Sequence, residues 1–364
     1  MALGVPKRHR AVLGVPEYQR TPELGDPERH WMALGVPECH RASACGPPDR
    51  RRFRGPGSRG LGRGGRISGV RVVVAGSSGL IGTALVAGLR GAGHEVLRLV
   101  RRTPSGPDER AWDPPSGRID PGALEGADVV VNLGGVGIAD RPWSGARRQA
   151  IRDSRIVPTE VLATAVAQAG VPALVSGSAV GYYGDAGPVE IDESAPSGGG
   201  FLAATCRDWE AATAPAAEAG ARVVTVRTGL VLSPSGGLLA IMRPVWKAFL
   251  GARVGSGEQY MPWVSLDDEI AGIRFAVENA ELRGPINMTG PSPVTNAVFT
   301  QTLAQAVGRP APLVIPGPVV STLAGDMGKE MLLFGQNAVP RTLLDAGFTF
   351  RHRTLADALS AAVH

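Results

Sequence analysis

The stretch Val70–Gly82 constrains the fold most, because an apolar, β-branched run leads directly into a turn with three glycines. Such a run is typical of a strand buried on both faces of a parallel sheet. Thr83–Arg90 then carries apolar residues at helical spacing. Strand, glycine turn and helix in this order predict a dinucleotide site, whose phosphates lie at the helix N-terminus. The alternative is a strand–helix turn without a ligand. The predicted contacts are Gly76, Ser77, Ser78, Gly79, Leu80, Ile81 and Gly82.

The end of the second predicted strand, His94–Val100, indicates which dinucleotide is bound. An acidic residue there would bind the 2′-hydroxyl of NAD, but the chain has Arg101 and Arg102. Because guanidinium groups can fork onto a phosphate, we predict NADP(H) rather than NAD(H). The alternative is a solvated strand end. A further strand, Asp128–Gly135, is expected to end at the same crevice.

Strands and helices alternate as far as residue 232. The later segments predicted in this part are a helix over 146–169 with a kink or break at Pro158, a strand over 173–178, a helix over 201–219 and a strand over 222–226. The alternation predicts an α/β fold with a Rossmann-type doubly wound parallel sheet. Residues 70–232 are expected to form the NADP-binding domain.

From Ser233 onward the parallel pattern stops. The helices expected beyond this point span 238–250, 268–279 and 296–307, with short extended pieces around Val264 and Ile286. Residues 233–364 are therefore expected to form a smaller C-terminal substrate lobe, which includes a distinct last segment, 316–364.

The N-terminal segment 1–69 differs from the rest in composition. It holds 13 of the 38 Lys and Arg and 6 of the 33 Asp and Glu, so the remainder has 25 basic and 27 acidic residues. Few apolar side chains are available to offset ordering of its Arg-, Gly- and Pro-rich part, so we expect disorder. The alternatives are a nucleic-acid-binding arm, a weak metal site at Cys39, His40 and Cys45, or upstream sequence translated before a valine start at Val70.

Cysteine content and hydropathy indicate the compartment. Cys206 stands alone in the body, which fits a reducing, cytoplasmic setting. No apolar run approaches the ~20 residues that span a bilayer, and no signal-peptide core precedes the first strand. We expect a small-molecule substrate, and neither a nucleic-acid nor a membrane partner; the oligomeric state stays open.

Short motifs follow one another along the body: Ala75–Gly82, Asn132–Gly135, Arg152–Arg155, Ser176–Asp185, Arg227–Leu232, Gly255–Gln259, Pro262–Asp268, Pro293–Asn296 and Leu343–Phe348. With these motifs, residues 70–362 resemble the extended, sugar-nucleotide-epimerase-like short-chain dehydrogenase/reductases, and more narrowly the YfcH-like epimerase family proteins. The resemblance implies that Arg101 binds the 2′-phosphate. It further implies dinucleotide contacts from Leu133, Gly134, Arg155 and Val231. The last segment resembles an appended domain of unassigned role in that family.

Hydride chemistry in this superfamily rests on a serine or threonine and on Tyr-x-x-x-Lys, in which the lysine lowers the pKa of the tyrosine. Here Pro22, Ala186, Gly187 and Val264 stand four residues after the four tyrosines, so the pair is absent. Aligned through Trp209-Glu210, Leu202 and Cys206 occupy the two positions. Ser178 matches the superfamily serine.

Other groups remain for catalysis. Tyr182 or Tyr183 can supply a phenol as an acid; the alternative is loop packing over the nicotinamide. Cys206 as a nucleophile is a weaker alternative, because a lone helix cysteine usually fills a core. The predicted catalytic residues are thus Ser178, Tyr182 and Tyr183. The body's histidines, His94, His352 and His364, support neither a Ser-His-Asp triad nor a zinc cluster, so no metal is predicted, and no P-loop is present.

Two functions are compatible with this sequence. One is an NADP(H)-dependent epimerase-like or oxidoreductase enzyme that acts on a carbonyl, an alcohol or a nucleotide sugar. The other is an NADP(H)-binding sensor or scaffold without catalysis. Ser178, the tyrosine loop and the expected substrate lobe favour the enzyme, whereas the missing Tyr-Lys pair favours the sensor.

Overall fold

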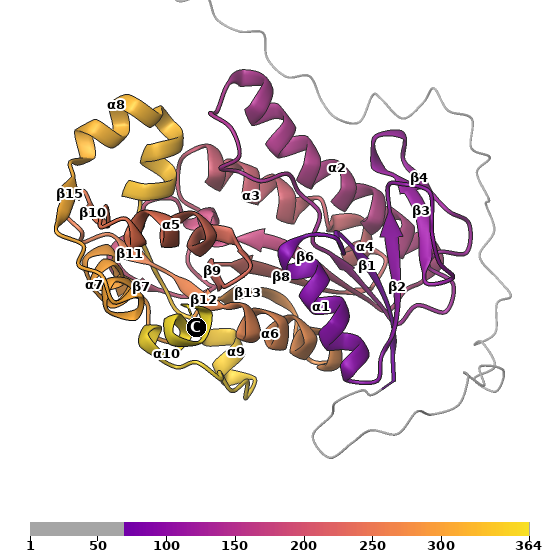
Figure 1. The fold of residues 1–364 in the computed structure, drawn as a ribbon. Coiled ribbons are helices and arrows are strands. Elements are labelled where there is room, and N and C mark those ends of the chain that lie inside the picture. The colour runs from indigo at the N-terminus through magenta and orange to yellow at the C-terminus, as the bar shows by residue number, and fades with distance from the viewer. Residues whose placement is uncertain (1–68, 364) are drawn as a thin grey trace, which may run out of the picture. The chain divides into compact units, whose positions relative to one another are not determined.

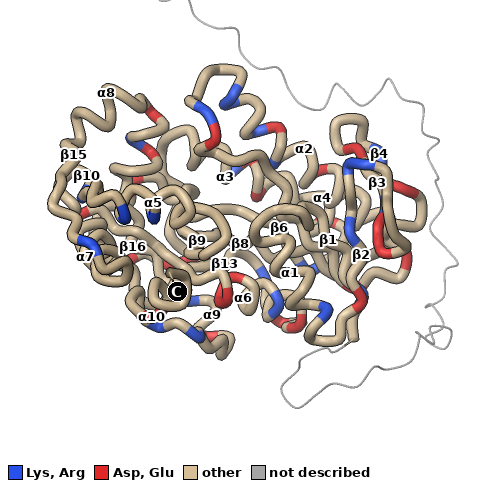
Figure 2. The backbone as a smooth tube through the Cα atoms, in the orientation of Figure 1, with Lys and Arg blue, Asp and Glu red and all other residues tan. Residues whose placement is uncertain are grey.

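The computed structural model describes residues 69–363 (Figure 1). The expectations for the N-terminal tail therefore fall almost wholly outside the described residues. Within the described body, basic and acidic side chains are interspersed over most elements (Figure 2). Among these residues no helix is long and apolar enough to cross a membrane.

An eight-stranded sheet, in the order β13-β8-β6-β5-β1-β2-β3-β4, forms the centre of the body. Its strands are β1 (Arg71–Ala75), β2 (Glu95–Val100), β3 (Glu109–Asp113), β4 (Arg118–Ile119), β5 (Val129–Asn132), β6 (Ala173–Ala179), β8 (Arg222–Thr228) and β13 (Gly284–Met288). Neighbouring strands run parallel except for β3 and β4. The predicted Rossmann-type α/β sheet is confirmed.

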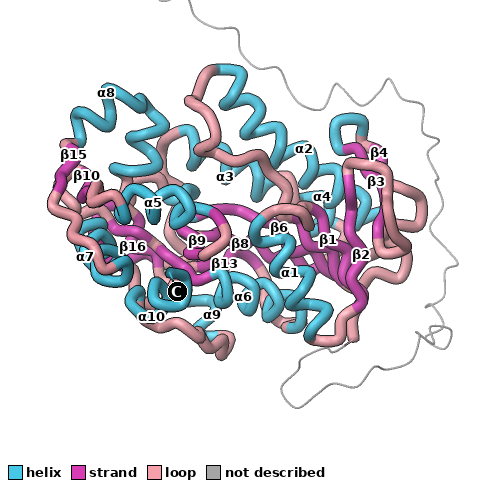
Figure 3. The backbone as a smooth tube through the Cα atoms, viewed as in Figure 1, coloured by secondary structure: helices cyan, strands magenta, loops and turns pink. Residues whose placement is uncertain are grey.

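Helices cover both faces of this sheet (Figure 3). They are α1 (Leu80–Gly91), α2 (Gly145–Ala169), α3 (Phe201–Ala211), α4 (Ala214–Glu218) and α6 (Leu266–Glu278). Side chains of β1 alternate between two cores: Val72 and Val74 pack in the core that includes α1 and α6, and Val73 packs in the core that includes α2 and α4. Both faces of the strand are buried from Val72 to Ala75, which is why these four residues are apolar.

Two predicted helices differ in detail. α2 runs continuously through Pro158, so the expected break is wrong; the proline removes one backbone hydrogen bond without ending the helix. The helix expected over 201–219 is divided into α3 and α4, with Ala212 and Thr213 between them. Among the arginines of α2, Arg155 is half-buried.

The parallel sheet does not end at Ser233. β13 pairs in parallel with β8, with Ile286 opposite Val226, so the prediction that the parallel pattern stops at residue 233 is wrong. β13 is an edge strand of five residues that contains Pro285, a residue tolerated at sheet edges. Its short run gave only a weak strand signal in the sequence.

The part of the chain expected to form the C-terminal lobe combines helices with short two-stranded sheets, although Leu343, Phe348 and Phe350 pack in the core of the central sheet. Its helices are α5 (Gly237–Lys247), α7 (Asn296–Val307), α8 (Gly317–Gly328), the π-helical η4 (Lys329–Leu333), α9 (Arg341–Asp345) and α10 (Leu355–Val363). The short strands form parallel pairs in three cases: β12 (Trp263–Ser265) with β9 (Leu230–Ser233), β10 (Ala252–Val254) with β15 (Leu313–Ile315), and β16 (Gln336–Ala338) with β7 (Gly187–Ile191). The pair of β11 (Tyr260–Met261) and β14 (Val294–Thr295) is antiparallel. Short 3₁₀ turns, η2 (Pro114–Ser116) and η3 (Val180–Tyr183), complete the elements.

The lobe has its own core, in which Leu239 and Trp246 of α5 pack with Trp263, Phe299 of α7 and Leu359 of α10. The pairing of β16 with β7 connects the last segment to the loop region after β6. This places residues from the end of the chain beside the predicted catalytic residues.

Candidate functional site

The glycine turn between β1 and α1 has three glycines in different surroundings. Gly76 has a φ of +79°, and a Cβ there would lie 2.6 Å from the carbonyl carbon of Leu133 on the neighbouring β5 loop. A Cβ on Gly82 would lie 2.1 Å from the carbonyl oxygen of Gly76. These two positions exclude any side chain. A Cβ on Gly79 would meet only the Gly76 oxygen, at 3.6 Å, so the turn is open above Gly79.

The N-terminus of α1 is also open. Its N-cap is Gly79, no side chain caps it, and its first turn contains no acidic residue. By contrast, the hydroxyls of Ser144, Ser265 and Thr295 cap α2, α6 and α7. Amides at a helix N-terminus attract anions through hydrogen bonding and the helix dipole. The structure therefore leaves α1 suited to a phosphate group, as the sequence predicts.

The two arginines after β2 have different roles. Arg102 donates two hydrogen bonds to Glu109, at 2.9 Å to Oε2 and 2.6 Å to Oε1, and these bonds lower the pKa of the Glu109 carboxyl to about 2. Arg101 is exposed and has no hydrogen-bond or ion-pair partner among the described residues. Of the two predicted phosphate ligands, only Arg101 has a guanidinium free for a ligand.

Side-chain hydrogen bonds hold the loop after β5 in place. Asn132 accepts the amide of Gly134 at 3.2 Å and donates to the Thr159 hydroxyl of α2 at 2.8 Å. Arg155 donates to the carbonyl of Val136 at 3.1 Å, and its burial lowers the pKa of its guanidinium. Arg155 thus fixes the loop that carries the predicted contacts Leu133 and Gly134.

Val231 lies in β9, and its carbonyl oxygen is 3.4 Å from where a Cβ on Gly237 would stand. The neighbouring Gly236 approaches the side chain of Leu80 at the glycine turn. The predicted cofactor residues from β1, α1, β5 and β9 therefore meet at the carboxyl edge of the sheet, where open α/β folds bind their ligands.

Beside this edge, three polar side chains stand at one register of three adjacent strands. Ser178 of β6 is opposite Arg227 of β8, and Arg227 is opposite Asn287 of β13. Ser178 donates to Glu210 Oε1 at 2.6 Å, and Arg227 donates to both Glu210 oxygens, at 2.8 and 2.9 Å. Arg227 also donates to the Tyr183 hydroxyl at 2.9 Å. Because one register places them side by side, these groups form one buried network.

Tyr183 closes the network. Its hydroxyl donates to Asn287 Oδ1 at 2.7 Å, the residue is 3% exposed, and burial raises its pKa to about 12. The hydrogen bond to Asn287 and the raised pKa both make the Tyr183 hydroxyl a weaker acid toward a substrate. The neighbouring Tyr182 is half-buried, with the Arg227 guanidinium 3.5 Å from its ring centroid. Within residues 69–363 the Tyr182 hydroxyl has no hydrogen-bond partner, so it is the free phenol of the pair.

Cys206 lies on α3 next to this network. Burial raises the pKa of its thiol to about 12, which disfavours the thiolate that a nucleophile requires. A Cβ on Gly181, in η3 after β6, would lie 3.3 Å from Leu202 Cβ and 3.9 Å from Cys206 Sγ. Leu202 and Cys206 thus occupy the helix face beside Ser178.

The sequence alone did not identify Glu210, Arg227 and Asn287 as members of the site. Glu210 and Arg227 belong to motifs in the sequence, but neither residue is near Ser178 along the chain. The order of the strands is needed to place Arg227 and Asn287 at the register of Ser178, and Glu210 reaches the network from α3. In the described part of the chain, no group of three or more His, Cys, Asp or Glu side chains is arranged to hold a metal ion.

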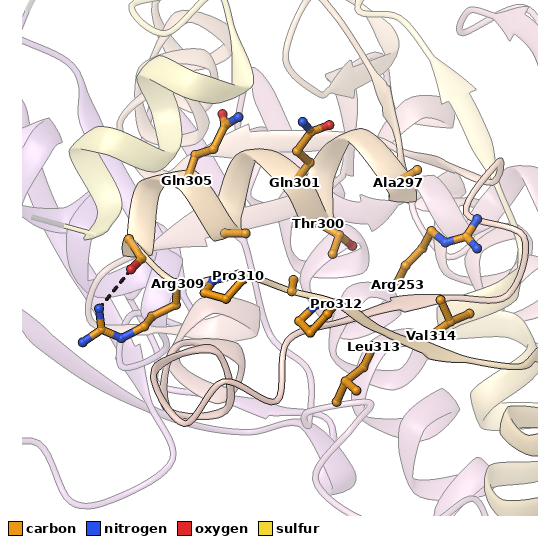
Figure 4. Close-up of a pocket in the computed structure, with 13 residues that line it drawn as sticks. Arg253, Ala297, Thr300, Gln301, Gln305, Arg309, Pro310, Pro312, Leu313 and Val314 are labelled. Atoms are coloured by element: carbon orange, nitrogen blue, oxygen red, sulfur yellow. Dashed lines mark hydrogen bonds between the residues drawn. The ribbon is translucent and has the colours of Figure 1, made fainter.

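A groove of about 620 Å³ lies elsewhere, in the C-terminal lobe between α7 and residues 309–314 (Figure 4). None of the predicted cofactor or catalytic residues lines it. The groove is therefore separate from the dinucleotide edge.

Comparison with known proteins identifies the chain's relatives. A model of the NAD dependent epimerase/dehydratase family matches residues 72–288, and a domain of unknown function, DUF1731, matches residues 315–362. The Mycobacterium bovis epimerase family protein Mb2239 is 55% identical over 291 residues, which is 80% of this chain and 97% of that protein.

Two solved structures are also similar. Human epimerase family protein SDR39U1, crystallised with NADPH, has a TM-score of 0.74 and 34% identity over 80% of this chain and 99% of its own. A nucleoside-diphosphate sugar epimerase from Corynebacterium glutamicum has a TM-score of 0.69 and 36% identity over 81% of this chain and 58% of its own. The narrower YfcH-like assignment stays a prediction. The open glycine turn fits a family that depends on NAD. The chain belongs to the NAD dependent epimerase/dehydratase family.

Proposed function

We propose that this protein binds NADP(H) and catalyses an epimerase-like or oxidoreductase reaction on a carbonyl, an alcohol or a nucleotide-sugar substrate. The observation that carries the cofactor proposal is the unpaired Arg101 at the same carboxyl edge of the sheet as the uncapped N-terminus of α1. Together they offer one cation and one set of amides for two phosphate groups. The similarity to human SDR39U1, whose structure contains NADPH, supports the same cofactor.

The test compares the two arginines. Arg101→Ala is expected to weaken NADPH binding by about 10- to 100-fold, the range for a lost charge-assisted hydrogen bond, while NADH binding stays unchanged. Arg102→Ala is the matched control, because it removes one of the partners of Glu109, which keeps Arg98 and Ser105, and it should affect stability more than NADPH preference. Isothermal titration with both nucleotides measures the effect. Equal weakening of NADPH and NADH by Arg101→Ala would show that the 2′-phosphate site is assigned wrongly.

The chemistry proposed for the site depends on which hydroxyls are free. Bound NADPH supplies a hydride. Ser178 already donates its proton to Glu210, so its oxygen can only accept a hydrogen bond from a substrate hydroxyl. Tyr182 has its donor free, so we assign it the role of giving the proton to a substrate carbonyl oxygen or hydrogen-bonding to that oxygen. Tyr183 positions Arg227 under the Tyr182 ring.

A turnover assay tests this role. NADPH consumption with a panel of carbonyl compounds should fall by about 10²-fold or more in Tyr182→Phe, since general acid catalysis contributes on that scale. Ser178→Ala should reduce it as well. NADPH affinity measured in the same variants is the control, because neither change touches the glycine turn. Turnover unaffected by Tyr182→Phe would exclude the tyrosine as the acid.

A second candidate function is an NADP(H)-binding sensor or scaffold without catalysis. The observation that favours it is the identity of two residues of α3. Leu202 and the buried Cys206 lie beside Ser178 and provide neither a phenol nor an amine. Tight NADPH binding without turnover of any carbonyl or nucleotide sugar would favour this candidate.

We also propose a cytoplasmic location. Its support is the single cysteine of the body, Cys206, which is buried and unpaired, as in proteins of reducing compartments. Fractionation of cells that produce the full chain, followed by detection of the protein, tests the location.

A further inference from the structure

Helix α5 has apolar side chains on two faces, and only one of them is covered. Leu239 and Trp246 are buried in the core of the lobe. On the other side, Ile241 is 65% exposed, Val245 39% and Phe249, just after the helix, 55%. Ile241 and Val245, four residues apart, share one face of α5. Phe249 follows in the turn after the helix, with a φ of +64°, and these three exposed residues are called the apolar stripe. A helix that is apolar on both sides is normally buried on both sides, so the second face lacks a partner within the described chain.

The apolar stripe continues onto neighbouring elements. Phe249 packs against the Arg309 guanidinium, 5.1 Å from its ring centroid, and the amide of Leu313 in β15 donates to the carbonyl of Gly251 at 3.4 Å. β15 then leads into α8 at the same end of the body (Figure 1). The exposed apolar residues of this region, here called the lobe surface, are Ile241, Val245, Phe249, Leu250, Leu313, Val314, Ile315, Val319 and Leu323. Isolated exposed leucines need no explanation, but this many exposed apolar side chains on neighbouring elements indicate an interaction site.

The segments that carry the lobe surface contain basic but no acidic residues up to Glu258 and Asp326, which follow them directly. Residues 229–257 and 289–325 contain Arg243, Lys247, Arg253 and Arg309 and no Asp or Glu. None of these four cations forms an ion pair with an acidic side chain among the described residues. Elsewhere in the body many arginines are paired, as Arg102 is with Glu109. In Figure 2 the tube at α5 and β10 carries Lys and Arg, in line with the sequence, and Arg309 follows the end of α7.

Exposed aliphatic side chains among unpaired cations suit one kind of partner in particular. We infer that the lobe surface attaches the protein to an anionic phospholipid membrane, with the apolar stripe entering the headgroup region and the cations meeting lipid phosphates. Interfacial helices bind membranes through this combination. A second copy of the chain fits poorly, because a two-fold contact would bring four cations against four cations. This inference departs from the sequence expectation of no membrane partner and is independent of the proposed enzyme activity.

The groove of Figure 4 opens on the same surface. Arg253, Arg309, Leu313 and Val314 line it together with α7. Thr300, on the side of α7 that faces residues 310–314, is 4% exposed, and its hydroxyl is buried without a hydrogen-bond partner. Because this hydroxyl is closed to solvent, the groove contributes exposed apolar and basic side chains to the lobe surface rather than a hydrogen-bond partner for a lipid.

Hydrogen–deuterium exchange on the full chain tests the inference, with vesicles of phosphatidylcholine containing phosphatidylglycerol and with vesicles of phosphatidylcholine alone. The expected result is slower exchange in peptides from 237–250 and 313–323 with the anionic vesicles only. The Arg-rich segment 1–69, with 13 Lys and Arg, can bind anionic vesicles through charge alone, and exchange separates the two contributions by peptide. Slower exchange confined to that segment, or none at all, would overturn the inference.

Variants measured by vesicle co-sedimentation give the second test. Ile241→Ser with Phe249→Ser changes no charge and should weaken binding by about tenfold or more, because lipid insertion scales with apolar area. The matched control is Val189→Ser, which alters a 68% exposed valine on β7, outside the lobe surface. Equal binding by both variants would overturn the inference. Binding of polyglutamate in place of anionic vesicles, lost in the double variant, would identify an acidic protein as the partner and also overturn it.

Discussion

Helices α1 and α3 differ in how their N-termini are satisfied, although both begin near the carboxyl edge of the sheet. α1 has a glycine N-cap without a side-chain partner. The first amides of α3, those of Phe201 and Leu202, instead donate to the Glu330 carboxylate at 2.8 Å each. Glu330 comes from the last segment of the chain, some 130 residues later. One helix end is left for an external anion, and the other holds an internal one.

At this edge of the sheet, the N-terminus of α1 is open for a ligand, whereas the N-terminus of α3 is closed by a side chain of the protein itself. A carboxylate on α1 would occupy the position proposed for the phosphates and repel them. On α3 a carboxylate does no such harm, and it ties the C-terminal segment to the helix beside Ser178. The edge therefore keeps one cationic helix end open, and Arg101 nearby is unpaired in the same way.

The largest effect at the open N-terminus of α1 is expected from a substitution of Gly82. Gly82→Ala would place a methyl group 2.1 Å from the carbonyl oxygen of Gly76, so β1 and α1 must move apart. We expect a loss of at least ~3 kcal/mol in the free energy of unfolding, the upper range for overpacking, together with loss of NADPH binding. Chemical denaturation and nucleotide titration measure the two effects.

Gly79→Ala separates the two effects. Its methyl group would meet only the Gly76 oxygen, at 3.6 Å, and the backbone φ of −77° suits alanine. Unfolding should change little, whereas NADPH binding should weaken because the methyl group stands where the pyrophosphate approaches. Unchanged binding in Gly79→Ala would show that the turn is only a tight strand–helix connection.

The contrast also explains what the sequence could predict. The glycine turn was predictable because β1, the turn and α1 are adjacent in the chain, and their chemistry depends on local spacing. The network of Ser178, Arg227 and Asn287 was not, because it depends on the register of three strands. Asn287 was hidden further, since β13 was not expected in the parallel sheet.

Tyr183 and Arg102 illustrate a second limit. Residue type indicated that both could act on a ligand, but the structure commits their polar groups to Asn287 and Glu109. Whether a side chain is free depends on its neighbours in space, which no motif records. Glu330 gave no signal at all, because a single glutamate far along the chain does not indicate which helix it caps.

Glu269 on α6 contrasts with the exposed Arg101, because it is an acidic side chain that is buried without a cation. It is fully buried, accepts one hydrogen bond from Thr228 at 2.9 Å, and its second oxygen has no partner among the described residues. Burial raises its pKa to about 8. The carboxyl is therefore mainly protonated at neutral pH.

The raised pKa predicts how stability depends on pH. Below about pH 4.5 Glu269 is protonated in both the folded and unfolded states, and its contribution is fully present. Between that pH and about 8 only the unfolded state releases the proton, so stability falls as pH rises and levels off above the folded pKa. Glu269→Gln mimics the protonated acid and should remove a few kcal/mol of this dependence, seen as a flatter plot of unfolding free energy against pH. A slope identical to that of the parent protein would mean that Glu269 is ionised when folded.

The smallest expected effect concerns the closed helix end. Glu330→Ala removes the acceptor of two amides on α3 and should lower the free energy of unfolding by about 1–2 kcal/mol, the range for a lost N-cap. Glu330→Gln keeps an oxygen acceptor and removes the charge, so it should lose less. Hydrogen exchange of residues 201–206 should become faster in Glu330→Ala, while exchange of α1 stays unchanged. If both helices responded alike, the two N-termini would not be independent, and the carboxylate of Glu330 would contribute to the cofactor edge as well as to α3.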